Sequence, residues 1–124
     1  MGTAVVIAVV ALVSVGTAHA WADDASDRGQ KVYQQCAACH SLEEGVTLAG
    51  PSLHDLFGRK AASIDSFDYS DAFYGADFVW DEGHLAKWVA DPRAMIPGTK
   101  MQTPGIKDSA QVADLIAYLK EATR

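Results

Sequence analysis

The chain has 124 residues, enough for one domain, and a folded part of about 100 residues buries only a modest core unless a cofactor, metal or disulfide stabilises it. Its formal net charge of −6 has the wrong sign for nucleic-acid binding, so we expect no nucleic-acid partner. The only two cysteines, Cys36 and Cys39, have two residues between them, so a structural disulfide would close a very small loop and add little stability.

The N-terminal segment predicts export. Residues 4–18 form a run of about 15 apolar and small residues, and the stretch 18–22, AHAWA, offers small residues to a signal peptidase. Because a membrane-spanning helix needs roughly 20 residues, we expect residues 1–20 to be a signal peptide, cleaved after Ala20 or Ala22, and the protein to be periplasmic. Nothing is charged before Asp23, so two alternatives stay open: a start inside a longer leader, and an uncleaved membrane anchor.

The remainder of the chain is expected to be one domain. A short acidic linker is predicted at residues 21–26, followed by a folded domain at residues 27–124. Ser26 or Asp27 can cap a first helix that carries Val32 and Tyr33.

Residues 36–40, CAACH, admit three kinds of chemistry. A redox dithiol needs a strand before the pair and a helix after it, and neither flank is rich in β-branched residues. A zinc site needs four ligands, and the histidines after His40, His54 and His84, lie far apart. Attachment of a c-type haem fits best, because two thiols one helical turn apart can each add to a haem vinyl group while the next residue supplies an imidazole to the iron.

An iron held by one histidine needs a ligand on its other face, and the candidates are Met95, Met101, His54, His84 and the lysines. Met101 follows residues 96–100, IPGTK, which combine a proline that fixes φ with a glycine that relaxes it. Such an irregular loop can hold a thioether against a metal, whereas a lone methionine usually fills core space. We therefore expect Met101 to be the second ligand.

The next helical pattern begins after residue 80. Asp81 can cap a helix that presents Leu85, Trp88 and Val89 on one face, and Pro92 then ends it. A helix with one apolar face packs that face against the core.

The last helix is predicted to start at Asp108 or Ser109 and to carry Lys120 near its C-terminal end. Its apolar residues recur with helical spacing. They are Val112, Leu115, Ile116 and Leu119. The pattern as a whole predicts an all-α fold in which helices surround a haem.

Four motifs follow one another along the chain: GPSLHDLFGRK at residues 50–60, FDYS at 67–70, IPGTKM at 96–101 and DLIAYLK at 114–120. In these motifs and their order, the sequence from about Asp27 to the C-terminus resembles class I cytochromes c of the mitochondrial and bacterial periplasmic type. The resemblance implies the small fold of that class, with one covalent haem c. It also implies that the first and last helices cross, with Gly29 and Tyr33 packed against Leu115 and Tyr118.

Carried over position by position, the resemblance implies the iron ligands. Cys36 and Cys39 form the thioethers, and His40 and Met101 are the axial ligands. Pro51 matches the proline whose carbonyl accepts a hydrogen bond from the proximal imidazole and so fixes its orientation.

The resemblance also implies which residues meet the polar parts of the haem. Arg59, Tyr69 and Trp80 match residues that hydrogen-bond the haem propionates, so that these charges are buried beside donors. Thr99 matches a hydroxyl in a polar network next to the methionine.

Two positions depart from mitochondrial members of the class. Phe73 and Trp88 stand where those proteins usually carry Asn and Tyr, so an amide and a phenol that could hold a buried water are replaced. A drier distal side stabilises the oxidised, more positive haem less. We therefore expect a reduction potential at or above the usual range of the class.

Charged residues are unevenly distributed. Residues 61–86 contain six acids and no Lys or Arg, whereas residues 93–107 contain Arg93, Lys100 and Lys107 and no acid. One interpretation is that both stretches are ordinary solvated surfaces. Because Met101 lies in the basic stretch, our hypothesis is instead a charge dipole that points the haem edge toward an acidic partner.

The ligand set implies a one-electron carrier and not an enzyme, because iron with two protein ligands has no open position for substrate or oxygen. The resemblance implies a monomer that docks transiently between a cytochrome bc-type complex and a terminal oxidase or photosynthetic reaction centre. One alternative is a carrier anchored to the membrane by residues 3–20. Another is a haem peroxidase or gas-binding protein, for which Met101 would have to leave the iron readily and for which the sequence lacks a distal His and Arg.

Overall fold

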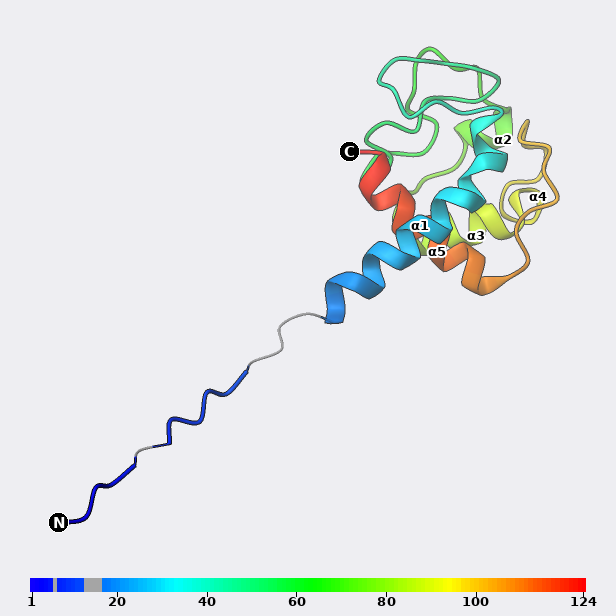
Figure 1. Cartoon of the computed structure of the whole chain (residues 1–124). Coiled ribbons are helices and arrows are strands. Elements are labelled where there is room, and N and C mark those ends of the chain that lie inside the picture. The colour runs from blue at the N-terminus through cyan, green and yellow to red at the C-terminus, as the bar shows by residue number, and fades with distance from the viewer. Residues whose placement is uncertain (6, 13–16) are drawn as a thin grey trace.

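The computed structural model describes residues 1–5, 7–12 and 17–124, and in these residues the regular structure is helical (Figure 1). The helices are α1 (Thr17–Ala37), α2 (Asp71–Tyr74), α3 (Glu82–Ala90), α4 (Pro92–Met95) and α5 (Ser109–Ala122). The described residues contain no strand, only an isolated antiparallel bridge between Lys60 and Val79. The prediction of an all-α fold is confirmed.

The predicted start of the first helix is wrong. Helix α1 begins at Thr17, so Ser26 and Asp27 lie inside it, and the expected linker at residues 21–26 is helical. No proline or glycine occurs between residues 17 and 28, and alanine is frequent there, so nothing local stops the helix. The Ser26 hydroxyl donates a hydrogen bond of 2.9 Å to Glu121 of α5 instead of capping α1.

The expected signal peptide, residues 1–20, falls partly outside the described residues, which omit residue 6 and residues 13–16. It therefore stays a prediction. None of the helices in the described part of the chain is long and apolar enough to span a lipid bilayer.

Helices α1 and α5 cross, as Figure 1 shows, and Gly29 lies at the crossing. A Cβ atom on Gly29 would lie 1.9 Å from the carbonyl oxygen of Asp114 and 2.7 Å from Cβ of Tyr118, so only glycine fits there. The Tyr33 and Tyr118 rings pack with centroids 5.3 Å apart, and Leu115 is completely buried. The expected pairing of Gly29 and Tyr33 with α5 is confirmed.

The Asp81 cap of α3 is confirmed: its side chain accepts a hydrogen bond of 2.7 Å from the backbone N–H of His84. Leu85, Trp88 and Val89 are buried on one face of α3 as predicted. The helix ends at Ala90, before Pro92 takes the first position of α4, where a proline loses no helical hydrogen bond.

Asp108 is the N-cap of α5, and its carboxylate accepts hydrogen bonds from the backbone of Ala110 (2.8 Å) and Gln111 (3.2 Å). The four apolar residues predicted to share one face are all buried. They are Val112, Leu115, Ile116 and Leu119. Helices α3 and α5 thus contribute apolar walls to the centre of the molecule, while irregular chain closes the rest (Figure 1).

Candidate functional site

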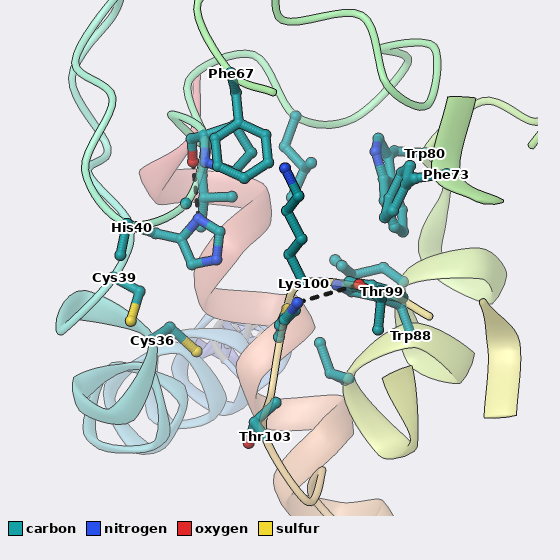
Figure 2. Close-up of a pocket in the computed structure, with 18 of the residues that line it drawn as sticks. Cys36, Cys39, His40, Phe67, Phe73, Trp80, Trp88, Thr99, Lys100 and Thr103 are labelled. Atoms are coloured by element: carbon teal, nitrogen blue, oxygen red, sulfur yellow. Dashed lines mark hydrogen bonds between the residues drawn. The ribbon is translucent and has the colours of Figure 1, made fainter. Parts of the chain in front are cut away.

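One cavity of about 380 Å³ lies between the end of α1, the loop 49–59, the segment 99–106 and the inner faces of α3 and α5 (Figure 2). All nine residues that the sequence singled out as site residues line it. They are Cys36, Cys39, His40, Pro51, Arg59, Tyr69, Trp80, Thr99 and Met101. The fold therefore brings together residues that are up to 65 positions apart (101 − 36).

His40 is held with one ring nitrogen free. Its Nδ1 lies 2.8 Å from the carbonyl oxygen of Pro51, and because a carbonyl only accepts, Nδ1 carries the proton. Figure 2 shows the ring directed into the cavity. Gly50 packs against the same ring, since a Cβ atom there would lie 2.5 Å from Cε1 of His40. The lone pair of Nε2 is therefore available to a metal ion.

The pKa of His40 is lowered from its ordinary value. Burial is the largest cause, the hydrogen bond to Pro51 opposes it, and the positive charge of Arg59 lowers the pKa further. At neutral pH the imidazole is therefore uncharged, the form that binds metals.

The two cysteines are free thiols on the last turn of α1 and just beyond it, where the backbone N–H groups of Cys39 and His40 both donate to the carbonyl of Cys36 at 3.0 Å. Burial, followed by the charge of Cys39, raises the pKa of Cys36 to about 11. A redox dithiol reacts as a thiolate, which a raised pKa disfavours. In the described ranges, moreover, no group of three or more His, Cys, Asp or Glu side chains comes together to hold a metal ion.

Met101 follows a loop shaped by Gly98 and Thr99. Gly98 has a φ of 85°, in the region that favours glycine. Thr99 is buried, and its Oγ1 accepts a hydrogen bond of 3.2 Å from the backbone N–H of Met101. Figure 2 shows Thr99 across the cavity from His40. The loop thus fixes the backbone of a half-buried methionine that lines the cavity.

The other candidate ligands lie elsewhere. Met95, His54 and His84 are not among the described residues that line the cavity. His84 instead stacks on Phe78, with ring centroids 4.7 Å apart, and its Nδ1 lies 2.8 Å from a carboxylate oxygen of Asp81. Of the methionine and histidine candidates, only Met101 lines the cavity, and of the lysines Lys100 lines it as well.

Aromatic side chains form one wall of the cavity. Phe73 and Trp88 are buried and meet edge to face, with ring centroids 5.2 Å apart. Tyr69 and Trp80 extend the same wall, at 5.2 and 6.3 Å from the Phe73 ring. The two positions at which the sequence departs from mitochondrial relatives therefore lie where they can limit water in the cavity.

Arg59 supplies a half-buried positive charge. Its Nη1 donates to the carbonyl oxygens of Ser52 (2.9 Å) and His54 (3.0 Å), so the guanidinium keeps further donors for another group. Burial lowers the pKa of Arg59, and the positive charge of Arg59 would be stabilised by an anion in the cavity. Tyr69 lies close to it, and its hydroxyl accepts a hydrogen bond of 3.4 Å from the N–H of Ile64.

Two of the three basic residues in the stretch 93–107 form ion pairs with carboxylates. Lys100 Nζ lies 3.1 Å from Oδ2 of Asp68, and Lys107 Nζ lies 3.7 Å from Oδ2 of Asp91. Arg93 takes part in no ion pair with another described residue. These pairs weaken the hypothesis of a charge dipole centred on the Met101 loop.

Several residues that line the cavity were not predicted from the sequence. They include Gln35, Phe67, Lys100, Gln102 and Thr103, together with apolar residues of α3 and α5. All five adjoin a predicted site residue or lie two positions from one, and that proximity is the only signal the sequence offers for them.

Comparison with known proteins agrees with this geometry. The sequence model of the family described as Cytochrome c matches residues 26–123. The chain is 42% identical to cytochrome c2 of Blastochloris viridis over 111 residues, which is 89% of this chain and 87% of that protein. It is 47% identical to cytochrome c2 iso-2 of Magnetospirillum fulvum over 88 residues, covering 71% of this chain and 92% of the relative.

A solved structure gives the same result for the fold. Cytochrome cH from Methylobacterium extorquens superimposes with a TM-score of 0.72 at 42% identity, covering 77% of this chain and 96% of the other. Sequence, fold and cavity agree, and the chain belongs to the cytochrome c family, as a class I c-type cytochrome.

Proposed function

We propose that His40 and Met101 would hold the iron of a haem c and that Cys36 and Cys39 would form the thioether links to it. Proteins of this family are electron carriers that hold one covalent haem c. The observation that carries the proposal is the hydrogen bond from Nδ1 of His40 to Pro51, which leaves Nε2 directed into a cavity that Met101 also lines. A metal-binding histidine commonly donates its other ring N–H to a fixed acceptor in this way.

The residues in the cavity fit a haem. A volume of about 380 Å³ is within the range of cofactor sites. The wall is apolar and aromatic, Cys36 and Cys39 place two thiols at the cavity, and Arg59 is available to an acidic group. Arg59, Tyr69 and Trp80 are proposed to hold the propionates, and Thr99 to fix the backbone of Met101.

The haem supplies a one-electron couple. If His40 and Met101 both held the iron, no position would be open for a substrate, so this chain would bind and orient the haem and exclude water from it. Phe73 and Trp88 exclude water from the cavity, and the hydrogen bond to Pro51 keeps the His40 ring in one orientation. A peroxidase or gas-binding function would require Met101 to leave the iron. The hydrogen bond from the backbone N–H of Met101 to Thr99 instead favours a loop that stays in place.

The proposed partners are a cytochrome bc-type complex as electron donor and a terminal oxidase or photosynthetic reaction centre as acceptor. Relatives named cytochrome c2 support an exported bacterial carrier. We propose that residues 1–20 are a signal peptide and that the monomeric domain from residue 27 onward works in the periplasm. A carrier anchored by an uncleaved N-terminal segment is the alternative.

The ligand assignment is tested by substituting the two methionines separately. Met101→Leu keeps the side-chain volume and removes the sulfur. We expect the ferric protein to lose the methionine-to-iron charge-transfer absorption and its potential to fall by more than about 100 mV. Met95→Leu is the control, expected to keep both properties. Retention of the absorption in Met101→Leu, or its loss in Met95→Leu, would overturn the assignment.

A further inference from the structure

The C-cap of α5 is a fully buried polar residue. Thr123 is only 1% exposed, and its Oγ1 donates a hydrogen bond of 2.7 Å to the carbonyl oxygen of Leu119, one turn earlier in the helix. The backbone N–H of Thr123 donates to the same carbonyl oxygen at 3.1 Å. Thr123 is not among the described residues that line the cavity. It is therefore fixed by contacts within the chain, and not by a group that the cavity would hold.

The backbone carbonyl of Thr123 reaches the loop that carries Arg59. It accepts a hydrogen bond from the backbone N–H of Asp55, and Figure 1 shows the end of α5 beside this loop. The two residues are 68 positions apart (123 − 55). Asp55 has a φ of 51°, in the left-handed region that residues other than glycine seldom adopt. A backbone in that region persists where surrounding contacts hold it, and the Thr123 carbonyl supplies such a contact.

Asp55 directly follows one of the two carbonyls that orient Arg59. Nη1 of Arg59 donates to the carbonyl oxygens of Ser52 (2.9 Å) and His54 (3.0 Å). The peptide group between His54 and Asp55 thus contains both the carbonyl that holds the guanidinium and the N–H that Thr123 holds. Because a peptide group is planar and rigid, a contact that fixes its N–H also fixes the direction of its carbonyl.

The other anchors of this loop act on different groups. The Ser52 hydroxyl donates to the carbonyl oxygen of Glu43 at 2.6 Å. The backbone N–H of Trp80 donates to the carbonyl oxygen of Arg59 at 2.8 Å. Neither hydrogen bond involves the peptide group that follows residue 54. Within the described part of the chain, the contact with Thr123 is therefore the backbone hydrogen bond that orients this peptide group on its N–H side.

We propose that Thr123 is a positioning residue for Arg59: its carbonyl fixes the peptide group after His54, and this peptide group fixes the guanidinium that lines the cavity. The inference rests on the proposed function, in which Arg59 meets an acidic group of the haem. A positive charge held beside the haem disfavours the oxidised, more positive form, so it raises the reduction potential. If the contact with Thr123 were loosened, the guanidinium would turn toward water and the potential would fall.

The orientation of Arg59 is read by NMR in Thr123→Gly and Thr123→Ser, which leave the charge of the chain unchanged. Glycine removes the side chain and frees the backbone at a helix end, where glycine is common, so the variant should still fold. Serine keeps the hydroxyl that bonds to Leu119.

We expect the Nη1–H protons of Arg59 in the reduced protein to exchange with water about tenfold faster in Thr123→Gly, because a hydrogen bond from a charged donor is loosened. In Thr123→Ser these protons should exchange at the wild-type rate. Equal exchange rates in the wild type, Thr123→Gly and Thr123→Ser would overturn the proposal.

The reduction potential separates a positioning role from a purely structural one. Voltammetry is carried out on Thr123→Gly, on Arg59→Gln and on the double variant. We expect Thr123→Gly to lower the wild-type potential by about a third or more of the fall caused by Arg59→Gln, and to leave the potential of Arg59→Gln unchanged, because its effect passes through the guanidinium. Thr123→Ser should keep the wild-type potential.

Two results of the voltammetry would overturn the proposal. An equal fall from Thr123→Gly in both backgrounds would mean that Thr123 stabilises the helix end without positioning Arg59. No fall from Thr123→Gly, where Arg59→Gln does lower the potential, would break the link between the two residues.

Failure of the proposed function would appear differently. A chain without covalent haem would show no reversible one-electron reduction in any of these variants. An Arg59→Gln potential equal to that of the wild type would remove Arg59 from the surroundings of the haem, and the exchange rates of its guanidinium protons would still decide whether Thr123 positions it.

Discussion

Gly50 contacts the ring of His40 so closely that a Cβ atom on Gly50 would lie 2.5 Å from Cε1 and 2.8 Å from Nδ1 of the imidazole. The position before Pro51 thus holds one side of the ring while the Pro51 carbonyl holds its Nδ1–H. Two adjacent residues therefore fix both the place and the rotation of the proposed ligand.

Gly50→Ala is expected to displace His40 because the added methyl group overlaps the ring. The ferric haem protein should show a changed Soret spectrum and faster binding of added imidazole, by about tenfold or more, since a misaligned ligand is held less firmly. Gly75→Ala is the control, because its nearest contact would be an ordinary 3.6 Å. Wild-type spectra and binding rates in Gly50→Ala would contradict the contact.

Gly29→Ala is expected to separate α1 from α5, because its Cβ would meet backbone atoms of Asp114 that cannot rotate away. Denaturant titration should show the free energy of unfolding lowered by about 3 kcal/mol. In the control, Gly83→Ala, the nearest new contact is 3.5 Å, to the Asp81 side chain, so its stability should stay within about 0.5 kcal/mol or rise. Similar stability in both variants would argue against a tight helix crossing.

Phe73→Asn is expected to lower the reduction potential by tens of millivolts, because an amide in the aromatic wall stabilises the oxidised haem. Phe73→Leu removes the same ring without adding polarity, and its potential should stay close to that of the wild type. Voltammetry of the three proteins makes the comparison. An unchanged reduction potential in Phe73→Asn, or an equal fall in Phe73→Leu, would show that the polarity of this wall does not set the potential.

Acid should weaken the contact between α1 and α5. Hydrogen bonds from Arg28 to both carboxylate oxygens of Asp114, at 2.9 and 3.0 Å, hold the pKa of Asp114 below its ordinary value. A carboxylate with a lowered pKa stabilises the folded state above its unfolded pKa of about 3.9 and loses that contribution as the pH falls toward the folded value.

Asp114→Asn removes this contribution. The difference in unfolding free energy between wild type and Asp114→Asn should be constant above about pH 5 and should shrink from there toward pH 3. Asp77→Asn, in an exposed loop, serves as the control. Parallel wild-type and Asp114→Asn curves across this range would mean that the ion pair does not set the pKa of Asp114.

The sequence predicted correctly those helices whose signals, a capping residue and apolar residues at helical spacing, lie within a few residues of each other. Asp81 and Asp108 are followed by apolar residues at helical spacing, and both cap the helices expected of them. The start of α1 was missed, because Ser26 resembles a cap while the residues before it are themselves good helix formers. What decides the role of Ser26 is Glu121, 95 positions away.

The candidate site shows the same limit. The proposed ligands occur in recognisable motifs, and the cavity that they line follows from the fold of the family. Lys100 and Asp68 are 32 residues apart in stretches of opposite charge, so composition alone suggested a basic face and could not predict that one neutralises the other. Surface ion pairs depend on loop positions that no sequence periodicity encodes.

The intact mass of the protein isolated from its own host, measured under denaturing conditions, decides whether this chain carries a covalent haem. We expect one chain that begins near Trp21 or Asp23 and carries the mass of one haem. The added mass should be absent when Cys36 and Cys39 are both replaced by serine. A chain without covalent haem would contradict the proposed attachment at Cys36 and Cys39.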